Sequence, residues 1–313
     1  MMMLSLPTSG FARSVNAHNV KLDTFCDWIE ASVIFSEYDV LSTTDVVDTL
    51  VDGEIYASQD FAREMVDNGW RELERRQIWM GIGSSIEVDG QRIRRTKHWR
   101  NCAGYSFLIM LSLARLYPAW ARGFGANYTE QGVLFEELTK RSLQGLFPGW
   151  QIFITGWSRE RVNRLPTVVR EVANRVREPI GNVSRWTRES ANEAGLDVLC
   201  YYEFQDGKGG SPVYLFQCAS GAQWEEKIHT PDIRIWSRVI EFTHTPQKAF
   251  VLPFSIPDDE FTRVCNRVNG MLLDRYRLLL PGATNPNWID ADLSLRLVTW
   301  LQNRIDNLIW DHE

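Results

Sequence analysis

Two apolar runs, LDVLCYYEF and VYLFQCA, constrain the fold more than any other feature of the sequence. They lie within residues 195–227 and are joined by a glycine-rich turn that Pro212 closes. This pattern predicts a hairpin of two buried strands. Each run nevertheless carries a polar residue among apolar ones, Asp197 in the first and Gln217 in the second. A buried carboxylate is costly unless it meets a donor, a cation or a metal, so we expect chemistry at this hairpin.

The bulk composition is that of a soluble globular protein with one large domain or two small ones. The chain has 313 residues, of which 44% are hydrophobic and 24% are charged. Its longest apolar run, FLIMLSLARLYPAW, is interrupted by Arg115 and Pro118 and is too short to span a bilayer. The first residues lack the pattern of a signal peptide. The five cysteines are scattered without a CxxC pair, which predicts neither disulfides nor a zinc site and favours the cytoplasm.

Charge is distributed unevenly along the chain. The formal net charge of −6 argues against a protein that coats nucleic acid by bulk electrostatics. Residues 91–100, however, hold five Lys or Arg and no acid, and residues 159–188 hold eight Arg against three Glu. These segments predict either one basic groove or two solvated faces. The residues expected to contact a nucleic-acid backbone are Arg92, Arg94, Arg95, Arg170, Arg175 and Arg177.

The first 125 residues predict a mainly helical N-terminal domain with a basic β-hairpin. Helical patterns cover residues 22–35, 42–51, 58–79 and 103–117, and a hairpin is expected around Asp89-Gly90. Helix, helix and basic hairpin is the order of a winged-helix module. A helical subdomain with an attached hairpin is the alternative, since the helix before the hairpin is acidic. Pro118 and the glycines that follow it predict a linker near residue 125.

The remainder, residues 126–313, predicts a second domain of the α/β class. Helical patterns alternate with strand patterns at 150–155, 195–220 and 248–253. Single helices are expected over 131–146, 166–176, 223–239, 257–280 and 290–310.

The motif search leaves a cluster of oxygen donors. The sequence has no GxSxG, HExxH, Walker A loop or EF-hand spacing. Asp197 and Gln217 lie on neighbouring predicted strands, and Glu136 or Glu137 lies on the helix before the sheet. Two carboxylates and an amide oxygen are ligands that Mg²⁺ or Mn²⁺ selects.

The segments GVLFEEL, GLDVL and VYLFQCASG together resemble the PD-(D/E)xK nuclease superfamily over residues 131–251. In that family a helical acid, a strand Asp and a Glu or Gln on the next strand bind a divalent metal, and a Lys follows two residues later. The resemblance places Glu136, Asp197 and Gln217 in these roles, with Glu137 as the alternative helical acid. It implies a restriction-endonuclease-like central mixed sheet flanked by helices, behind a helical N-terminal domain.

The sequence departs from the family pattern at the lysine, where it has Ala219. Lys227, ten residues after Gln217, is the candidate replacement. The resemblance then implies a Mg²⁺-dependent endonuclease that hydrolyses phosphodiester bonds of nucleic acid, with DNA as the expected substrate and defence against foreign DNA as a role. If Lys227 does not replace the missing lysine, the chain is a catalytically inactive nucleic-acid-binding or scaffold protein.

Each candidate residue also has an ordinary structural interpretation. Glu136 and Glu137 have Lys140 and Arg141 at helical spacing, so they can be surface ion-pair partners. Asp197 can cap a turn, Gln217 can be a satisfied core amide, and Lys227 can be a surface lysine. A third interpretation of the whole chain is an interaction protein, or a homo-oligomer, whose Trp-rich N-terminal helices pack on a partner.

Overall fold

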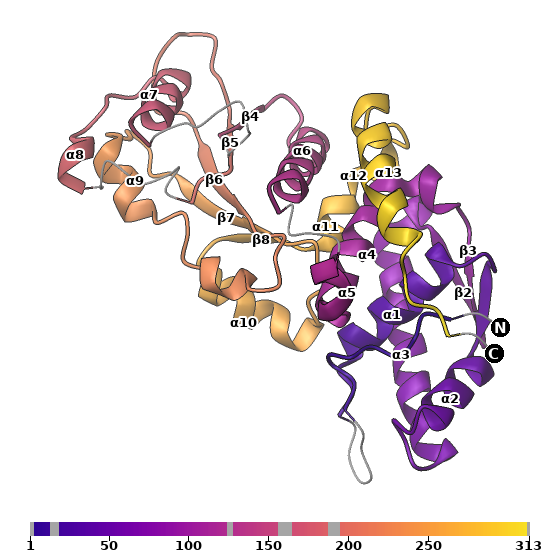
Figure 1. The fold of residues 1–313 in the computed structure, drawn as a ribbon. Helices are drawn as coiled ribbons and strands as arrows, with labels where there is room; N and C mark the ends of the chain where they lie inside the picture. The colour runs from indigo at the N-terminus through magenta and orange to yellow at the C-terminus, as the bar shows by residue number, and fades with distance from the viewer. Residues whose placement is uncertain (1–2, 13–18, 124–127, 156–164, 187–194, 312–313) are drawn as a thin grey trace. The chain divides into compact units, whose positions relative to one another are not determined.

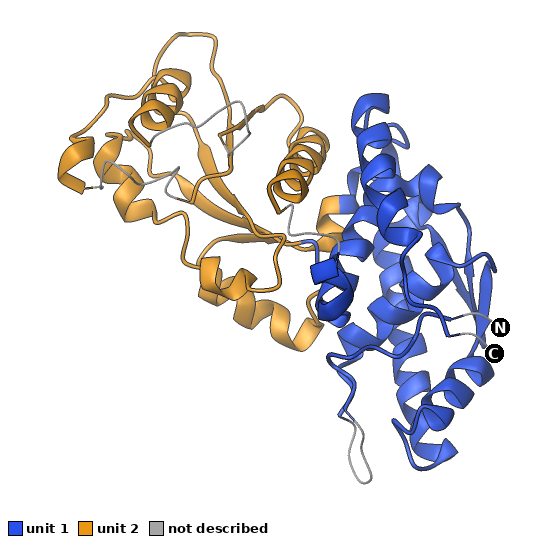
Figure 2. Ribbon diagram, in the orientation of Figure 1, with its two compact units in different colours: residues 1–126, 253–255, 279–313 blue, residues 127–252, 256–278 orange. Residues whose placement is uncertain are grey.

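The computed structural model describes residues 3–123, apart from 13–18, and residues 128–311, apart from 156–164 and 187–194 (Figure 1). The chain forms two compact units (Figure 2). Unit 1 contains residues 1–126, 253–255 and 279–313, and unit 2 contains residues 127–252 and 256–278. The expected linker near residue 125 falls largely in 124–127, outside the described residues. Residues 279–313, which the sequence placed in the second domain, group instead with the N-terminal helices.

Unit 1 is built on the helix pair α1 and α4, which are buried on nearly every side. The C-terminal helix α13 packs on α4, where Trp300 meets Phe107 with ring centroids 5.0 Å apart. Near the middle of the unit, the buried guanidinium of Arg76 links α3 to α1 through Asp27 and Glu30. The helices of unit 1 are α1 (Leu22–Phe35), α2 (Thr43–Asp52), α3 (Gln59–Met80), α4 (Ala103–Leu116), α5 (Pro118–Gly123), α12 (Pro281–Thr284) and α13 (Ala291–Ile305), with 3-10 turns η1 (Gly81–Gly83) and η2 (Trp99–Cys102).

A small antiparallel sheet completes unit 1. Its strands are β1 (Val40–Ser42), β2 (Ile86–Asp89) and β3 (Arg92–Arg95), in the order β1-β3-β2. The predicted hairpin is present, and Gly90 takes a positive φ of 56° at its turn. Ser42 caps the start of α2, since its hydroxyl accepts from the Asp45 N–H while the Asp45 carboxylate accepts from the Ser42 N–H. The order of elements in this part is therefore α1, β1, α2, α3, β2, β3.

Unit 2 has a five-stranded mixed sheet, which confirms the predicted mixed α/β class with a central sheet and flanking helices. The order is β4-β5-β6-β7-β8; β4, β5 and β6 are antiparallel, while β6, β7 and β8 are parallel. The strands are β4 (Gln151–Ile154), β5 (Val198–Tyr201), β6 (Val213–Cys218), β7 (Gln247–Val251) and β8 (Met271–Leu273). The helices are α6 (Tyr128–Leu146), α7 (Leu165–Val176), α8 (Val183–Trp186), α9 (Ile233–Val239), α10 (Asp258–Val268) and α11 (Arg275–Leu279), with the 3-10 turn η3 (Trp224–Lys227).

The two faces of this sheet are covered by different helices. Leu199 and Leu215 pack in one apolar cluster with residues of α7 and with Trp236 of α9. Cys218, which points to the opposite face because side chains alternate along a strand, donates its thiol hydrogen to Thr139 of α6. The hairpin β5-β6 is thus enclosed from both sides.

Two long helices predicted from the sequence are wrong. Residues 223–239 form the turn η3 and the short helix α9, separated by a loop that contains Pro231, which has no N–H to continue a helix. Residues 257–280 form α10, β8 and α11. Helix α10 ends at Asn269, which is left-handed, and a side chain at Gly270 would lie 2.3 Å from the Lys248 carbonyl oxygen. The chain therefore leaves the helix to run against β7.

Candidate functional site

Asp197 lies immediately before β5 and is 7% exposed. Its N–H donates to the Phe216 carbonyl (2.9 Å), so it continues the β5-β6 ladder. Its Oδ2 accepts from the Cys218 N–H (2.6 Å) and from the amide nitrogen of Gln217. Gly195 makes the approach to this position, with a φ of 72°, and a Cβ there would lie 2.4 Å from Thr230. The chain thus enters β5 through a turn that favours glycine and presents the carboxylate to the end of β6.

Gln217 is the direct neighbour of Asp197 and is 4% exposed. Besides its contact with Asp197, its Nε2 donates to the Cys218 carbonyl (3.2 Å), and its Oε1 accepts from the Thr230 hydroxyl (2.9 Å). The structure therefore brings together the two polar residues that stand out in the apolar runs.

Glu136 lies on α6, the helix that packs against the Cys218 face of the sheet. Gln131, near the start of this helix, donates to the carbonyl (3.2 Å) and hydroxyl (3.1 Å) oxygens of Ser220, just beyond β6. Thr139 contacts Cys218 (3.7 Å). Glu136 lies between these two contacts along the helix and is half-buried. The N-terminal half of α6 therefore runs past the end of β6.

The pKa of the Cys218 thiol depends on the charged groups around it. Burial raises its pKa well above the usual value, and the negative charges of Asp197 and Glu136 raise it further. The Thr139 hydroxyl and the positive charge of Lys227 act in the opposite direction. Glu136, Asp197 and Lys227 are thus all within electrostatic range of one buried atom, which favours Glu136 over Glu137 as the helical acid.

Lys227 ends the turn η3 and is exposed. Its carbonyl accepts from the hydroxyl (2.7 Å) and the N–H (2.9 Å) of Thr230, the residue that also contacts Gln217. Ala219, which occupies the family's lysine position, is buried and pairs with Val251 of β7 through its N–H. The turn that carries Lys227 is therefore fastened to the candidate site through Thr230.

Lys248 of β7 also holds this turn, and the sequence analysis did not single it out. It is 8% exposed, and its Nζ donates to the Ile228 carbonyl (2.6 Å). Burial lowers its pKa, which the negative charge of Asp232 partly opposes. A lysine inside the apolar run KAFVLP was the available signal.

The three arginines of the unit 1 hairpin have different surroundings. Arg92 is exposed. Arg94 forms an ion pair with Glu87 across the hairpin (2.8 Å). The Nη1 of Arg95 donates to the carbonyls of Ile34 (3.0 Å) and Ser36 (2.8 Å) at the end of α1, so this side chain has a structural role.

The arginines in and just after α7 also differ in their surroundings. Arg170 is exposed. Arg175 pairs with Glu171 (3.1 Å) and lies over the ring of Phe153 (3.7 Å), while Arg177 pairs with Glu203 (3.1 Å). Residues 159–164 and 187–188 of the Arg-rich segment 159–188 lie outside the described residues.

The donor set suits a hard divalent cation in its chemistry. Carboxylate and amide oxygens are the preferred ligands of Mg²⁺ and Mn²⁺. Within the described residues no three His, Cys, Asp or Glu side chains lie together so as to hold a metal ion; the predicted set contains two carboxylates and an amide. The Gln217 amide directs its nitrogen to Asp197 and its oxygen to Thr230. The amide oxygen of Gln217 would become a metal ligand only if the side-chain amide rotated by 180°.

Comparison with known proteins gave no match to a family model, to a curated protein or to a solved structure. In the part of the chain that the structure describes, no helix combines the length and apolar character needed to cross a membrane.

Proposed function

We propose that this chain is a metal-dependent nuclease of the restriction-endonuclease-like fold that hydrolyses phosphodiester bonds of nucleic acid, with DNA as its substrate. The observation that carries the proposal is the contact between Asp197 and Gln217 at the ends of two central strands. Glu136 and Lys227 support it, because both charges act on Cys218 beside that contact. The mixed five-stranded sheet with helices on both faces agrees with the proposed fold.

In this mechanism Asp197 and Glu136 would hold Mg²⁺ or Mn²⁺, and Gln217 would contribute its amide oxygen if its side-chain amide were rotated by 180°. When bound, such an ion supplies Lewis acidity and an activated water. Lys227 stabilises the negative charge that grows on the phosphate. Thr230 and Lys248 position Lys227 by holding the carbonyls of the turn 227–230.

Unit 1 supplies the grip on the nucleic acid in this proposal. Its element order and its sheet order β1-β3-β2 support a winged-helix module whose wing is the β2-β3 hairpin. Arg92 and Arg94 of the hairpin then contact the phosphate backbone, and Arg170 is a candidate phosphate contact of unit 2 by itself. Such contacts give affinity without sequence specificity. A cytoplasmic location agrees with five free cysteines, and a role in defence against foreign DNA rests on the family resemblance alone.

One observation favours a second candidate, a catalytically inactive protein that binds nucleic acid. Ala219 stands in place of the family's lysine and is buried in strand pairing, and Lys227 is exposed. In this alternative the sheet is kept as a binding scaffold.

Cleavage of plasmid DNA with Mg²⁺ or Mn²⁺ tests the enzyme proposal. We expect nicking by the wild type and a loss of at least a hundredfold in Asp197→Ala, because the metal loses a ligand. Asp206→Ala is the matched control, since Asp206 lies on the exposed hairpin turn and accepts only from Lys208 among its recorded contacts. Equal nicking by wild type and Asp197→Ala would reject the proposed site. Binding of DNA without cleavage in either metal would favour the inactive binder.

A further inference from the structure

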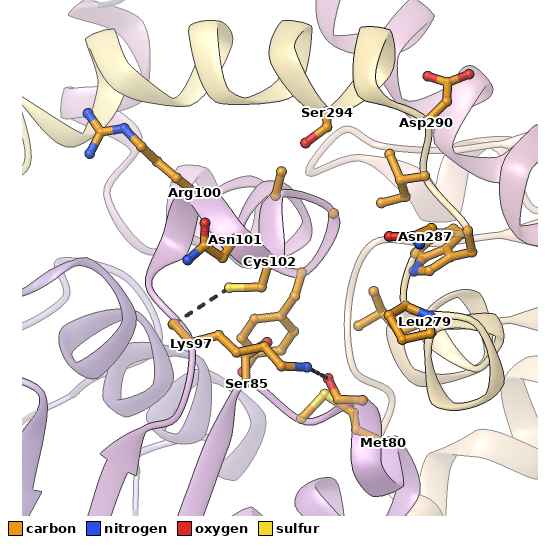
Figure 3. A pocket seen from close by; sticks show the side chains of 18 of the residues that line it. Met80, Ser85, Lys97, Arg100, Asn101, Cys102, Leu279, Asn287, Asp290 and Ser294 are labelled. Carbon is orange, nitrogen blue, oxygen red and sulfur yellow. Dashed lines mark hydrogen bonds between the residues drawn. The ribbon is translucent and has the colours of Figure 1, made fainter.

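Unit 1 contains a cavity of about 640 Å³ that the proposed nuclease does not use. It lies between the segment 97–105 at the start of α4 and the segment 279–294 at the start of α13 (Figure 3). A volume of this size is typical of pockets that enclose small organic ligands. All of its lining residues belong to unit 1.

One wall of the cavity is positively charged. The ammonium of Lys97 donates to the Gly83 carbonyl (3.3 Å), and the guanidinium of Arg100 donates to the side-chain oxygen of Gln302. Both acceptors are neutral oxygens, and the guanidinium of Arg100 also lies over the ring of Trp99 (4.2 Å), so none of these contacts supplies a negative charge. Figure 3 shows Asn101 between the Arg100 and Lys97 side chains, whose charged ends point in different directions. Both side chains line the cavity, so they can offer positive charge to an anionic group at two places on this wall.

Neighbouring groups respond to this positive potential. Burial lowers the pKa of His98, and the charges of Arg95 and Arg100 lower it further. Burial raises the pKa of Cys102, whereas hydrogen bonds from Ser106 and Ser85 and the positive charge of Lys97 oppose that rise. The positive charges of Arg100 and Lys97 thus extend to groups next to the cavity.

The opposite wall offers an aromatic ring and polar groups. Trp288 is half-buried and packs against Gly282, where a Cβ would lie 2.9 Å from the indole nitrogen. Ser294 of α13 faces the cavity from the same side (Figure 3). Asp290, the one acid in the lining, already accepts from the Leu293 N–H (2.8 Å) as the cap of α13. This wall suits a planar ring with polar edges.

We propose that this cavity binds a mononucleotide, with its phosphates against Lys97 and Arg100 and its base against Trp288. Inorganic phosphate would fill only a fraction of the volume and would leave the indole wall unused. An uncharged ring compound would leave two cations without a counter-charge. A phosphorylated nucleoside carries both groups at opposite ends.

Calorimetric titration of ATP, GTP, CTP, UTP and AMP into the full-length chain tests the proposal. The wild type is expected to bind at least one of them with a Kd below about 1 mM, corresponding to about −4 kcal/mol. The double variant Lys97→Met/Arg100→Gln is expected to bind at least tenfold more weakly. Arg122→Gln is the matched control, because Arg122 is an exposed cation of unit 1 outside the cavity lining.

Two further variants distinguish a nucleotide site from a general anion site. Arg100→Lys keeps the positive charge and should retain most of the affinity for nucleotides. Trp288→Leu should weaken the binding of nucleotides and leave the binding of inorganic phosphate unchanged. Circular dichroism establishes that each variant is folded. The proposal is overturned if no nucleotide binds at millimolar concentration, if the double variant binds as the wild type does, or if inorganic phosphate binds as tightly as the nucleotides.

Discussion

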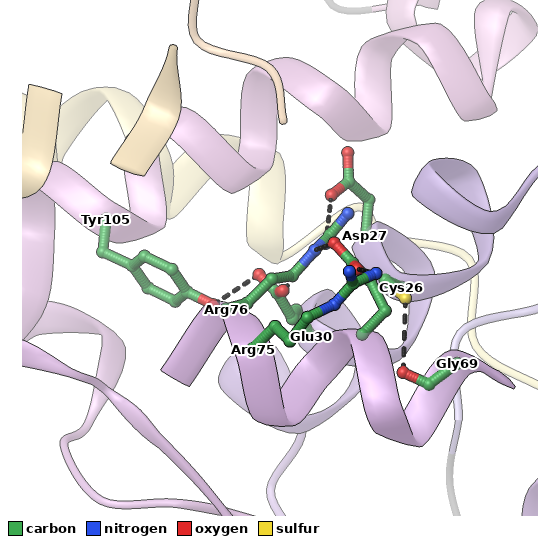
Figure 4. A network of polar contacts seen from close by, with 8 residues as sticks. Cys26, Asp27, Glu30, Gly69, Arg75, Arg76 and Tyr105 are labelled. Atoms are coloured by element: carbon green, nitrogen blue, oxygen red, sulfur yellow. Dashed lines mark hydrogen bonds and ion pairs between the residues drawn. The ribbon is translucent and has the colours of Figure 1, made fainter. Parts of the chain in front are cut away.

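Arg76 lies in a buried polar network that joins three helices of unit 1. Its side chain is fully buried, and its Nη1 lies 2.9 Å from both Asp27 Oδ1 and Glu30 Oε1 (Figure 4). Glu30 also accepts from the Tyr105 hydroxyl (2.5 Å), which extends the network from α1 and α3 to α4. Removing a partner from such a network leaves buried charges without compensation.

We therefore predict that Arg76→Met lowers the free energy of unfolding by about 3–5 kcal/mol. The loss arises because Asp27 and Glu30 remain buried beside an apolar side chain. Urea unfolding followed by circular dichroism measures it. Arg71→Met on the exposed side of the same helix is the control, with an expected change of at most about 0.5 kcal/mol. A loss below about 1 kcal/mol in Arg76→Met would contradict a structural role for the network.

At the residue scale, the sequence predicted that Asp197 and Gln217 lie on neighbouring strands. It did not predict that Thr230 and Lys248 hold the turn beside them. Asp197 and Gln217 were recognisable because each interrupts an apolar run on a predicted strand. Thr230 and Lys248 were not, because their roles arise from the return of residues 227–230 over the sheet. A lysine next to an apolar run marks Lys248 as unusual, but the neighbours of Thr230 and Lys248 in the sequence do not show that residues 227–230 return over the sheet.

The arginines of the β2-β3 hairpin have different roles. Arg92 is exposed, whereas Arg95 donates to two carbonyls at the end of α1. If the hairpin is a wing on DNA, these two arginines should respond to substitution in opposite ways.

We predict that Arg92→Gln weakens DNA binding. The plot of the logarithm of the binding constant against the logarithm of salt concentration should also become less steep by about 0.9, the value for one phosphate contact. The unfolding free energy of this variant should not change. Arg95→Gln should instead destabilise the chain by about 1–3 kcal/mol, because two partly buried carbonyls lose their donor. Binding titrations at several salt concentrations and urea unfolding measure the two effects. An unchanged affinity and slope in Arg92→Gln would remove the wing from the interface.

Among the elements, helices with regular apolar spacing were predictable, whereas the points where a helical pattern is interrupted were not. The expected helix over residues 22–35 coincides with α1, because its apolar spacing and its length are both unambiguous. Residues 257–280 also have a helical pattern, yet Asn269 and Gly270 turn the chain into β8. That turn is decided by the close approach of Gly270 to Lys248 on another strand, which a local pattern does not contain.

At the scale of the whole molecule, the chain forms two units and enters unit 1 three times. The return of residues 279–313 to unit 1 follows from the apolar face of α13, which buries Leu297, Trp300 and Leu301. The sequence predicted a helix over residues 290–310 but did not identify α4 as its packing partner. The division also separates the two proposed sites, since the nucleotide cavity lies in unit 1 and the metal residues lie in unit 2.

The central claim is that Asp197 and Glu136 of unit 2 hold a divalent metal. Calorimetric titration of Mn²⁺ into the full-length chain measures this directly, without depending on the choice of substrate. We predict that the wild type binds Mn²⁺ and that Asp197→Asn and Glu136→Gln each bind at least tenfold more weakly, a loss of about 1.4 kcal/mol or more, while Asp206→Asn binds as the wild type does. Equal binding by the wild type and Asp197→Asn, or no binding by the wild type, would contradict the claim.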